Sequence, residues 1–245
     1  MRLIPVLDIL NSVVVRGVAG NRDLYRPIES CLTTSVLALD VARAIREHYA
    51  FDEFYVADLD AIMHHRSGEA LYRQLIGDGF RLWIDAGVAN ASQAKTVFAS
   101  GAERVIVGLE SCSSPSDLQE VIDALTPERV VFSLDLKHGI PLAASDWGTD
   151  PEAIAAQAIG CGVTQLIVLD LAGVGTGAGV PTIPLCQKLR ATHGRSIEII
   201  TGGGVRGRDD LDCLEQLSID GVLVASILHQ PAFRLSETPS KSIRE

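Results

Sequence analysis

Residues 84–109, IDAGVANASQAKTVFASGAERVIVGL, align without a gap with residues 201–226, TGGGVRGRDDLDCLEQLSIDGVLVAS. In this alignment Gly87 falls on Gly204, and the apolar run 105–107 falls on the apolar run 222–224. Each copy contains an apolar strand, a glycine-containing turn, a helical stretch and a second apolar strand. A unit that occurs twice in one chain predicts two fused half-units that bury a common core.

Strand-like apolar runs recur along the whole chain, at residues 3–8, 53–58, 81–85, 104–108, 129–135, 164–170, 197–201 and 220–225. Eight strands that alternate with helical stretches predict an α/β fold, a single (β/α)8 TIM barrel built from two fused half-barrels. We expect the barrel over residues 1–230, with half-repeats of about 1–125 and 126–230. Residues 231–245 are expected to be the end of a last helix and a polar tail.

Two further patterns support the barrel. Helix caps are expected at Ser92, Ser114 and Asp150, and the last two precede a proline at the first helical position. A doubly wound sheet, the alternative α/β fold, usually has a G-x-G-x-x-G turn after its first strand. In this chain Asp8-Ile9-Leu10-Asn11 stands at that place, so the sequence favours the barrel.

The composition limits the classes of partner. A net charge of −10 and a pI near 5.0 argue against nucleic acid or an anionic membrane as a partner. A phosphorylated small molecule stays compatible with this charge, because helix N-termini and turn amides bind phosphate without lysine. The five cysteines form no C-x-x-C pair, and no signal peptide or membrane span is evident, so we expect a soluble cytoplasmic protein.

Asp8 and Asp135 are the candidate catalytic residues. Each ends an apolar strand, and the half-repeat places them on opposite sides of the mouth of the barrel, where active sites of this fold lie. Two carboxylates that face each other across a substrate can act as a base and an acid if their surroundings separate their pKa values. The alternative is that each carboxylate only caps a turn or pairs with a basic side chain.

A glycine run marks the candidate phosphate site. Gly202, Gly203 and Gly204 follow the seventh strand, and Ala225 and Ser226 follow the eighth. Glycines let the backbone approach a ligand closely, and the loops after these two strands are the usual phosphate site of such barrels. A plain tight turn is the alternative interpretation of the run.

The corresponding places in the first half are less suited to phosphate. Gly87 and Gly108 are the candidate residues there, but Asp85 aligns with Gly202, and Glu110 follows Gly108 closely. Two carboxylates would repel a phosphate dianion at short range. The sequence therefore predicts an intact phosphate site in the second half and an altered one in the first.

Three other features of the sequence bear on the site. The glycine-rich segment 173–179, which contains Thr176, is either a lid over the substrate or a plain connection. Trp147 either stacks on a flat ligand or packs in the core. His64 and His65 lack companions at the spacing of metal ligands, so no metal site is expected.

Over residues 2–230 these motifs resemble two sister barrels of histidine biosynthesis: ProFAR isomerase (HisA) and the cyclase subunit of imidazole glycerol phosphate synthase (HisF). The resemblance rests on the opening run 4–9, on the second strand 54–60, on Asp135-Leu136-Lys137-His138-Gly139 with the later Trp147, and on the turn 201–205. It implies that Asp8 is the general base and Asp135 its catalytic partner in an Amadori rearrangement of an aminoaldose phosphate. It also assigns substrate binding to Lys137, Trp147, Thr176 and Asp58, and it implies no metal and no organic cofactor.

The chain also departs from the isomerase pattern. Val174 stands where the isomerase has an aspartate in its sixth loop, and Asp85 and Ala225 stand where it has glycines. ProFAR carries phosphates at both ends, whereas this chain keeps one clear phosphate site. The sequence therefore favours a diverged paralogue that acts on a phosphorylated sugar-type metabolite with one phosphate, over ProFAR isomerase itself. The pathway is left open between histidine biosynthesis and the methanopterin-linked one-carbon metabolism in which isomerase-like relatives are known.

Two other functions fit the residues. Asp135-x-Lys137 is compatible with a phosphosugar lyase or decarboxylase, which requires Lys137 to point into the mouth. A non-catalytic barrel that binds a phosphorylated ligand is the third interpretation. It predicts that the loss of either Asp8 or Asp135 leaves the biological role intact. The sequence gives no prediction of the oligomeric state.

Overall fold

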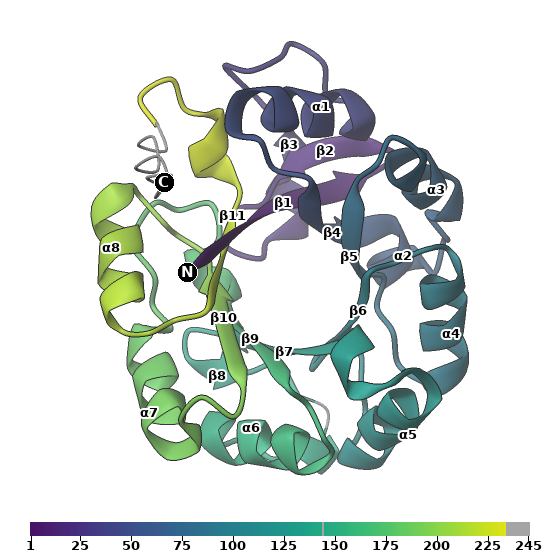
Figure 1. Cartoon of the computed structure of the whole chain (residues 1–245), viewed down its shortest axis with the longest axis vertical. Helices are drawn as coiled ribbons and strands as arrows, with labels where there is room; N and C mark the ends of the chain where they lie inside the picture. The colour runs from purple at the N-terminus through teal and green to yellow at the C-terminus, as the bar shows by residue number, and fades with distance from the viewer. Residues whose placement is uncertain (144, 234–245) are drawn as a thin grey trace, which may run out of the picture.

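The chain forms the expected closed barrel. The structure is a computed structural model that describes residues 1–143 and 145–233. Its eight parallel strands are β1 (Arg2–Leu10), β4 (Glu53–Asp58), β5 (Arg81–Asp85), β6 (Arg104–Gly108), β7 (Val130–Lys137), β9 (Gln165–Asp170), β10 (Glu198–Gly202) and β11 (Gly221–Val224). They pair in chain order, and β11 closes the ring by pairing in parallel with β1 (Figure 1).

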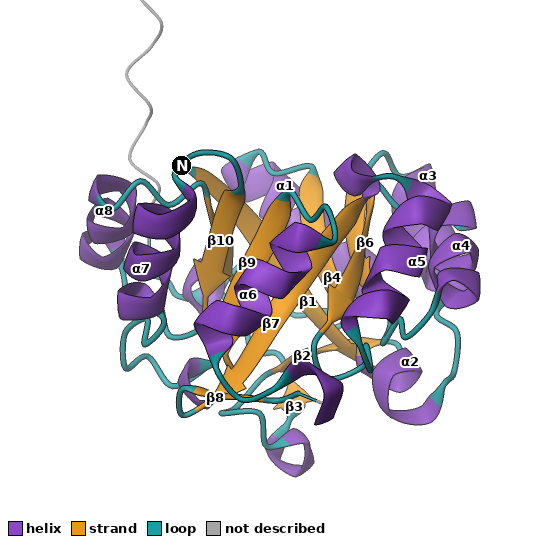
Figure 2. Cartoon of the chain, turned by 90° about the horizontal axis from the view of Figure 1, so that it is seen from below, coloured by secondary structure: helices purple, strands orange, loops and turns teal. Residues whose placement is uncertain are grey.

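A ring of helices surrounds the strands (Figure 1). It consists of α1 (Ala38–Tyr49), α3 (Glu69–Gly77), α4 (Ala91–Ala99), α5 (Pro115–Leu125), α6 (Pro151–Gly160), α7 (Ile183–His193) and α8 (Arg208–Gln216). The short helix α2 (Leu59–His64) follows β4 directly and lies at one end of the barrel, together with the small strands β2 (Val13–Arg16), β3 (Arg26–Pro27) and β8 (Ile140–Pro141) (Figure 2). The TIM-barrel prediction is confirmed, whereas the fusion of two half-barrels stays an interpretation of the sequence repeat.

Two of the three expected helix caps are confirmed. The Ser114 side chain accepts the amide of Asp117 at α5, and the Asp150 side chain accepts the amide of Glu152 at α6. The cap expected at Ser92 is wrong: Asn90 caps α4 by accepting the amide of Gln93, and Ser92 lies inside the helix. Asn90 has an extended backbone and a side-chain oxygen that reaches the third helical amide, so the helix begins one residue earlier than Ser92.

The chain after β11 was expected to end in a short helix and a polar tail. The structure shows a 3-10 helix over Ser226–His229, and the greater part of the predicted tail, residues 234–245, lies outside the described residues. Within the described part of the chain, no helix combines the length and the apolar character that are needed to cross a membrane.

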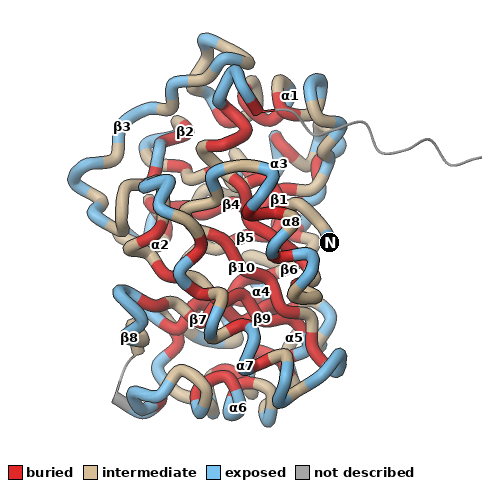
Figure 3. The backbone as a smooth tube through the Cα atoms, turned by 90° about the vertical axis from the view of Figure 1, so that its left-hand side faces the viewer, coloured by how far each residue is buried: buried red, intermediate tan, exposed pale blue. Residues whose placement is uncertain are grey.

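The core has two layers, and Figure 3 shows the strands of the barrel coloured as buried over much of their length. The outer layer packs between the strands and the helices, with Phe54 and Val56 of β4 as examples. The inner layer fills the barrel interior, and every barrel strand contributes a large buried side chain to it: Ile4, Tyr55, Trp83, Ile106, Val131, Ile167, Ile200 and Leu223. These side chains fill the barrel lower down, and the carboxyl ends of the strands are where active sites of this fold lie.

Two aspartates at strand ends accept hydrogen bonds from backbone amides and do not face the barrel interior. Asp58 accepts the amide of Ala61 at 2.9 Å and the hydroxyl of Tyr72. Asp170 is 3% exposed and accepts the amides of His138 (3.0 Å), Gly139 (2.7 Å) and Ala172 (2.9 Å). Both lie on the outward-facing positions of their strands, in phase with the residues that pack against the helices. Asp58 and Asp170 therefore stabilise the loops at the mouth.

We expect Asp170→Ala to lower the free energy of unfolding by about 2–4 kcal/mol, because three backbone amides lose the side-chain oxygens that accept their hydrogen bonds. Urea unfolding followed by circular dichroism measures this change. Asp170→Asn is the matched control and should cost less, since its remaining oxygen can still accept part of these hydrogen bonds. An alanine variant as stable as the wild type would show that the three hydrogen bonds do not hold the loop.

Candidate active site

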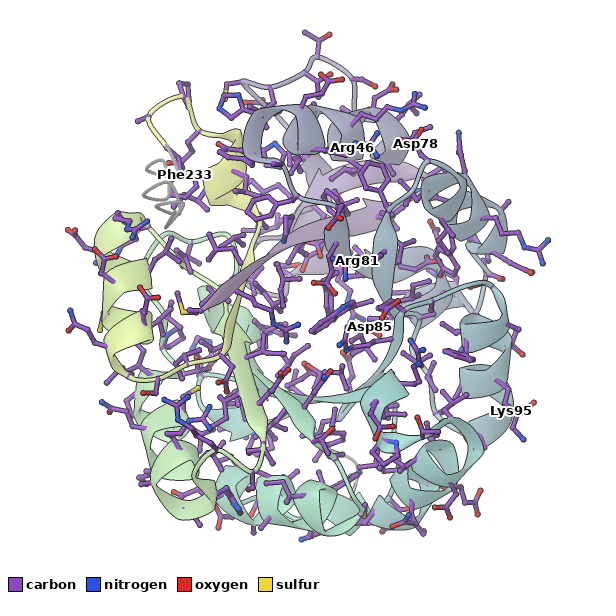
Figure 4. All side chains as sticks on the ribbon, in the orientation of Figure 1. Arg46, Asp78, Arg81, Asp85, Lys95 and Phe233 are labelled. Atoms are coloured by element: carbon purple, nitrogen blue, oxygen red, sulfur yellow. The ribbon has the colours of Figure 1, made fainter. Side chains whose placement is uncertain are left out.

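A cavity of about 310 Å³ opens at the carboxyl ends of the barrel strands. Four carboxylates line it: Asp8 at the end of β1, Asp85 at the end of β5, Glu110 after β6 and Asp135 on β7. Figure 4 shows Asp85 on the inner side of the barrel wall, whereas Lys95 lies on the outer ring of helices. The alternation of strand residues explains this placement, since Asp8 is in phase with the interior residue Ile4 and Asp85 with Trp83.

Asp8 lies under the loop that follows β2. Burial and the nearby charge of Asp85 raise the pKa of Asp8 to about 7, and a hydrogen bond from the Gly17 amide lowers it in part. A side chain on Gly17 would place its Cβ 3.2 Å from Asp8 Oδ2 and 3.0 Å from a methyl group of Val174. Glycine at this position therefore allows the loop backbone to approach the carboxylate closely.

Asp135 lies across the cavity on β7. Burial raises its pKa to about 7; the hydrogen bond from Ser133 opposes this shift, and the charges of Asp85 and Glu110 add to it. The Ser133 hydroxyl donates to Asp135 Oδ1 at 2.7 Å. A Cβ on Gly108 of the neighbouring strand would lie 3.1 Å from Asp135 Oδ2, so Gly108 leaves room for the carboxylate. The two candidate catalytic groups thus both titrate near neutral pH.

Asp85 is held by two donors. The Tyr55 hydroxyl donates to its Oδ2 at 2.8 Å, and the Gly87 amide donates to its Oδ1 at 3.2 Å. Burial raises the pKa of Asp85, and these two hydrogen bonds lower it in part. The pKa of Tyr55 lies well above its usual value, because the phenol is buried among carboxylates. Tyr55 therefore acts as a hydrogen-bond donor in this site.

Two arginines and the sixth loop close the mouth. Arg22 forms an ion pair with Glu110 at 2.9 Å, and Arg16 donates to the carbonyl oxygen of Gly175 at 2.9 Å. The amide of Ala19 donates to the carbonyl oxygen of Val174 at 2.8 Å. A Cβ on Gly175 would lie only 1.9 Å from the carbonyl oxygen of Gly17, so the two loops are in direct backbone contact. The glycine-rich segment thus lies against the loop that contacts Asp8, and a lid over the substrate stays one of its two interpretations.

The second-half phosphate candidates lie together at the cavity. Gly203, Gly204, Ala225 and Ser226 line it. Gly203 and Gly204 have φ values of +78° and +93°, which favour glycine, and within the described chain their amides donate no hydrogen bond to another protein group. Gly202 is part of the wall of β10, where a Cβ would lie 2.8 Å from Leu223 Cβ. This turn presents unpaired N–H groups, as an anion site requires.

Of the other predicted site residues, some line this cavity and others do not. Thr176 and Gly108 line the cavity, but Gly87 lies at a separate cavity of about 200 Å³. Lys137 is exposed and outside the cavity lining, so its placement does not support the lyase interpretation. Trp147 is 1% exposed, packs on Phe132 and donates from Nε1 to the carbonyl oxygen of Cys112 at 2.8 Å. In this structure Trp147 has the packing role that the sequence left open.

Four residues at the site were not predicted from the sequence: Gly17, Tyr55, Ser133 and Arg22. One signal was present for Ser133, because it lies two residues before Asp135 on a strand and so faces the same side. Nothing near Arg22 pointed to Glu110, from which it is separated by 88 residues. Among the described residues, no group of three or more His, Cys, Asp or Glu side chains is arranged to hold a metal ion.

The fold and the site together define a (β/α)8 barrel with a carboxylate-lined cavity and a glycine turn at the carboxyl ends of its strands. The profile of the family described as "Histidine biosynthesis protein" matches residues 2–234. The chain therefore belongs to the histidine biosynthesis protein family, as the sequence motifs had predicted.

Curated relatives agree with this family. An uncharacterized protein of Methanocaldococcus jannaschii is 30% identical over 245 residues, which cover 98% of this chain and 99% of the relative. The 1-(5-phosphoribosyl)-5-((5-phosphoribosylamino)methylideneamino) imidazole-4-carboxamide isomerase (ProFAR isomerase) of Deinococcus radiodurans is 26% identical, with 94% of each chain covered. The isomerase of the same name from Syntrophomonas wolfei is 27% identical, with 93% of this chain and 91% of the relative covered.

Proposed function

We propose that this protein is an isomerase of the ProFAR isomerase type that acts on a phosphorylated sugar-type metabolite, with Asp8 and Asp135 as its base and acid. The observation that carries the proposal is the pair of carboxylates that line one cavity and both have a pKa of about 7. Near pH 7 each group is present in both protonation states. One can therefore accept a proton while the other donates one.

The chemistry needs little more than these two groups. In an Amadori rearrangement, protonated Asp135 gives its proton to the ring oxygen of the aminoaldose, and the ring opens to an iminium at C1. Asp8 then takes the proton from C2, and the C2–H electron pair forms the C1–C2 double bond of an enol-amine. Loss of the O2 proton and addition of a proton at C1 give the aminoketose. Atoms and electrons balance within the substrate, so no oxidant is consumed.

The phosphate binds, in this proposal, at the turn of Gly203 and Gly204 with Ser226 beside it. The free amides of the turn supply donors without adding a charged side chain, which suits a chain with a net charge of −10. Binding energy from this remote group holds the sugar between Asp8 and Asp135. The glycine-rich segment 173–179, which lines the cavity, keeps water from the reacting carbons.

The test is an assay of the purified protein with two aminoaldose phosphates. ProFAR carries two phosphoribosyl groups, and an N-substituted ribosylamine 5-phosphate carries one phosphate. Chromatographic detection of the aminoketose from either compound supports the proposal, and conversion of ProFAR together with growth of a histidine auxotroph identifies the ProFAR reaction itself. A well-folded protein that rearranges neither compound contradicts the isomerase proposal.

A further inference from the structure

We infer that Asp85 is a specificity-determining residue that closes the first-half end of the cavity to phosphate. This inference rests on the proposed function and deepens it. The substrate class that follows is a sugar-type monophosphate, with its phosphate at the second-half turn and a hydrogen-bond-donating group, not a second phosphate, opposite Asp85. Three observations carry it: the internal alignment, the hydrogen bonds of Asp85, and the charges around it.

The internal alignment identifies the two places that correspond. Residues 84–109 align with 201–226, so Asp85 corresponds to Gly202 and Gly87 to Gly204. In the second half, the residue at 202 has no side chain, and the amide of Gly204 is free of protein partners within the described chain. In the first half, the amide of Gly87 already donates to Asp85 Oδ1 at 3.2 Å. The amide that a phosphate would need as a hydrogen-bond donor is therefore already bound to the Asp85 carboxylate.

The Asp85 carboxylate is fixed in this place. The Tyr55 hydroxyl donates to its other oxygen at 2.8 Å, and Tyr55 itself is a buried member of the barrel interior. The two oxygens are therefore engaged from two sides, by a side chain of β4 and by the turn after β5. A ligand phosphate would have to displace the Asp85 carboxylate from these two donors. It would also be repelled at short range by the negative charge of that carboxylate.

The charges nearby act in the same direction. Glu110 is the second carboxylate at this end of the cavity, and the charges of Asp85 and Glu110 both raise the pKa of Asp135. Arg22 is the nearby cation, and it is already paired with Glu110 at 2.9 Å. A phosphate dianion at this end of the cavity would therefore be repelled by Asp85 and Glu110, and the charge of Arg22 would offset part of this repulsion. An amine or hydroxyl group could instead donate hydrogen bonds to the two carboxylates.

The test measures anion binding and does not depend on catalysis. Wild-type protein, Asp85→Gly and Asp85→Asn are titrated by calorimetry with inorganic phosphate and with ProFAR. Asp85→Gly places the second-half residue in the first half, and Asp85→Asn keeps the acceptor oxygen but removes the charge. Glu120→Gln, which removes a charge from the exposed face of α5, is the matched control. Circular dichroism of each variant checks that it is folded.

We expect wild-type protein and Glu120→Gln to bind one equivalent of phosphate, and Asp85→Gly to bind a second. The affinity for ProFAR should rise at least about tenfold in Asp85→Gly and less in Asp85→Asn. If neither Asp85 variant binds phosphate or ProFAR better than the wild type does, the inference is overturned, whatever the isomerase assay shows. If the wild type already binds two equivalents, the inference is overturned while the second-half site and the isomerase proposal stand.

The two proposals fail separately. Loss of the single wild-type phosphate on Gly203→Val would place that phosphate at the second-half turn, as the isomerase proposal requires. If the wild type binds no phosphate and Asp85→Gly gains one, Asp85 is confirmed as the blocking residue, and the proposed phosphate site of the isomerase is wrong.

Discussion

Asp135→Asn is expected to lower the isomerase turnover number by about 10²–10⁴-fold, the usual contribution of a general acid or base. Asparagine has nearly the shape of aspartate and can still accept the hydrogen bond that Ser133 donates to Asp135 at 2.7 Å. It cannot exchange a proton, so ring opening loses its acid. Asp8→Asn should have an effect of similar size, because abstraction of the C2 proton loses its base.

Steady-state kinetics on whichever aminoaldose phosphate the wild type rearranges measure this effect. The wild-type turnover number should show a bell-shaped dependence on pH centred near pH 7, because the pKa values of Asp8 and Asp135 are both about 7. Glu120→Gln serves again as the control and should retain wild-type kinetics. If both asparagine variants keep more than about a tenth of the turnover, Asp8 and Asp135 are not the catalytic pair. If both also retain the biological role, the non-catalytic interpretation gains support.

The double variant Asp8→Asn/Asp135→Asn is expected to be more stable than the wild type at pH 8, by about 2–4 kcal/mol for each site. Each carboxyl has a pKa of about 7 in the folded chain, against an ordinary pKa of 3.8 for an aspartate in the unfolded chain. Between these values the folded state binds more protons than the unfolded state does. The wild-type free energy of unfolding therefore falls as the pH rises from about 4 to 7, as far as these groups contribute.

The pH dependence is the specific part of this second prediction. The stability difference between the double variant and the wild type should be small near pH 4, grow through the interval up to about pH 7, and level off by pH 8. Urea unfolding at pH 5 and pH 8 measures it, and Glu120→Gln should show no such trend. A difference that is the same at both pH values would mean that the two carboxylates are not destabilised by burial.

The two effects have a common physical origin. Burial that raises the pKa of a carboxyl group destabilises its charged form, and the same shift brings the group into the range where it can exchange protons at neutral pH. A chain that retains two such groups in one cavity carries a cost in stability that an asparagine pair would remove. This cost is typical of sites that are kept for chemistry rather than for folding.

The sequence by itself determined the barrel. Each strand–helix unit is set by local apolar runs, turns and caps such as Ser114 and Asp150, and eight such units in one chain leave few ways to pack. The sequence also identified Asp8 and Asp135, because each is a polar residue at the carboxyl end of an apolar strand. Both line the cavity, as the barrel geometry requires.

Only the tertiary structure decided what the other polar residues at the mouth do. Asp58 had the same sequence signature as Asp8, yet it faces outward and holds α2. Strands buried on both faces are apolar throughout, so the sequence does not show which of their side chains point inward. Lys137 at the end of β7 lies outside the cavity lining, and Trp147 packs on Phe132. The place of the Asp85 carboxylate depends on Tyr55, thirty residues away in the chain. Such contacts form between segments that only the closed barrel brings together, and their geometry decides which carboxylate is free to react and which is held.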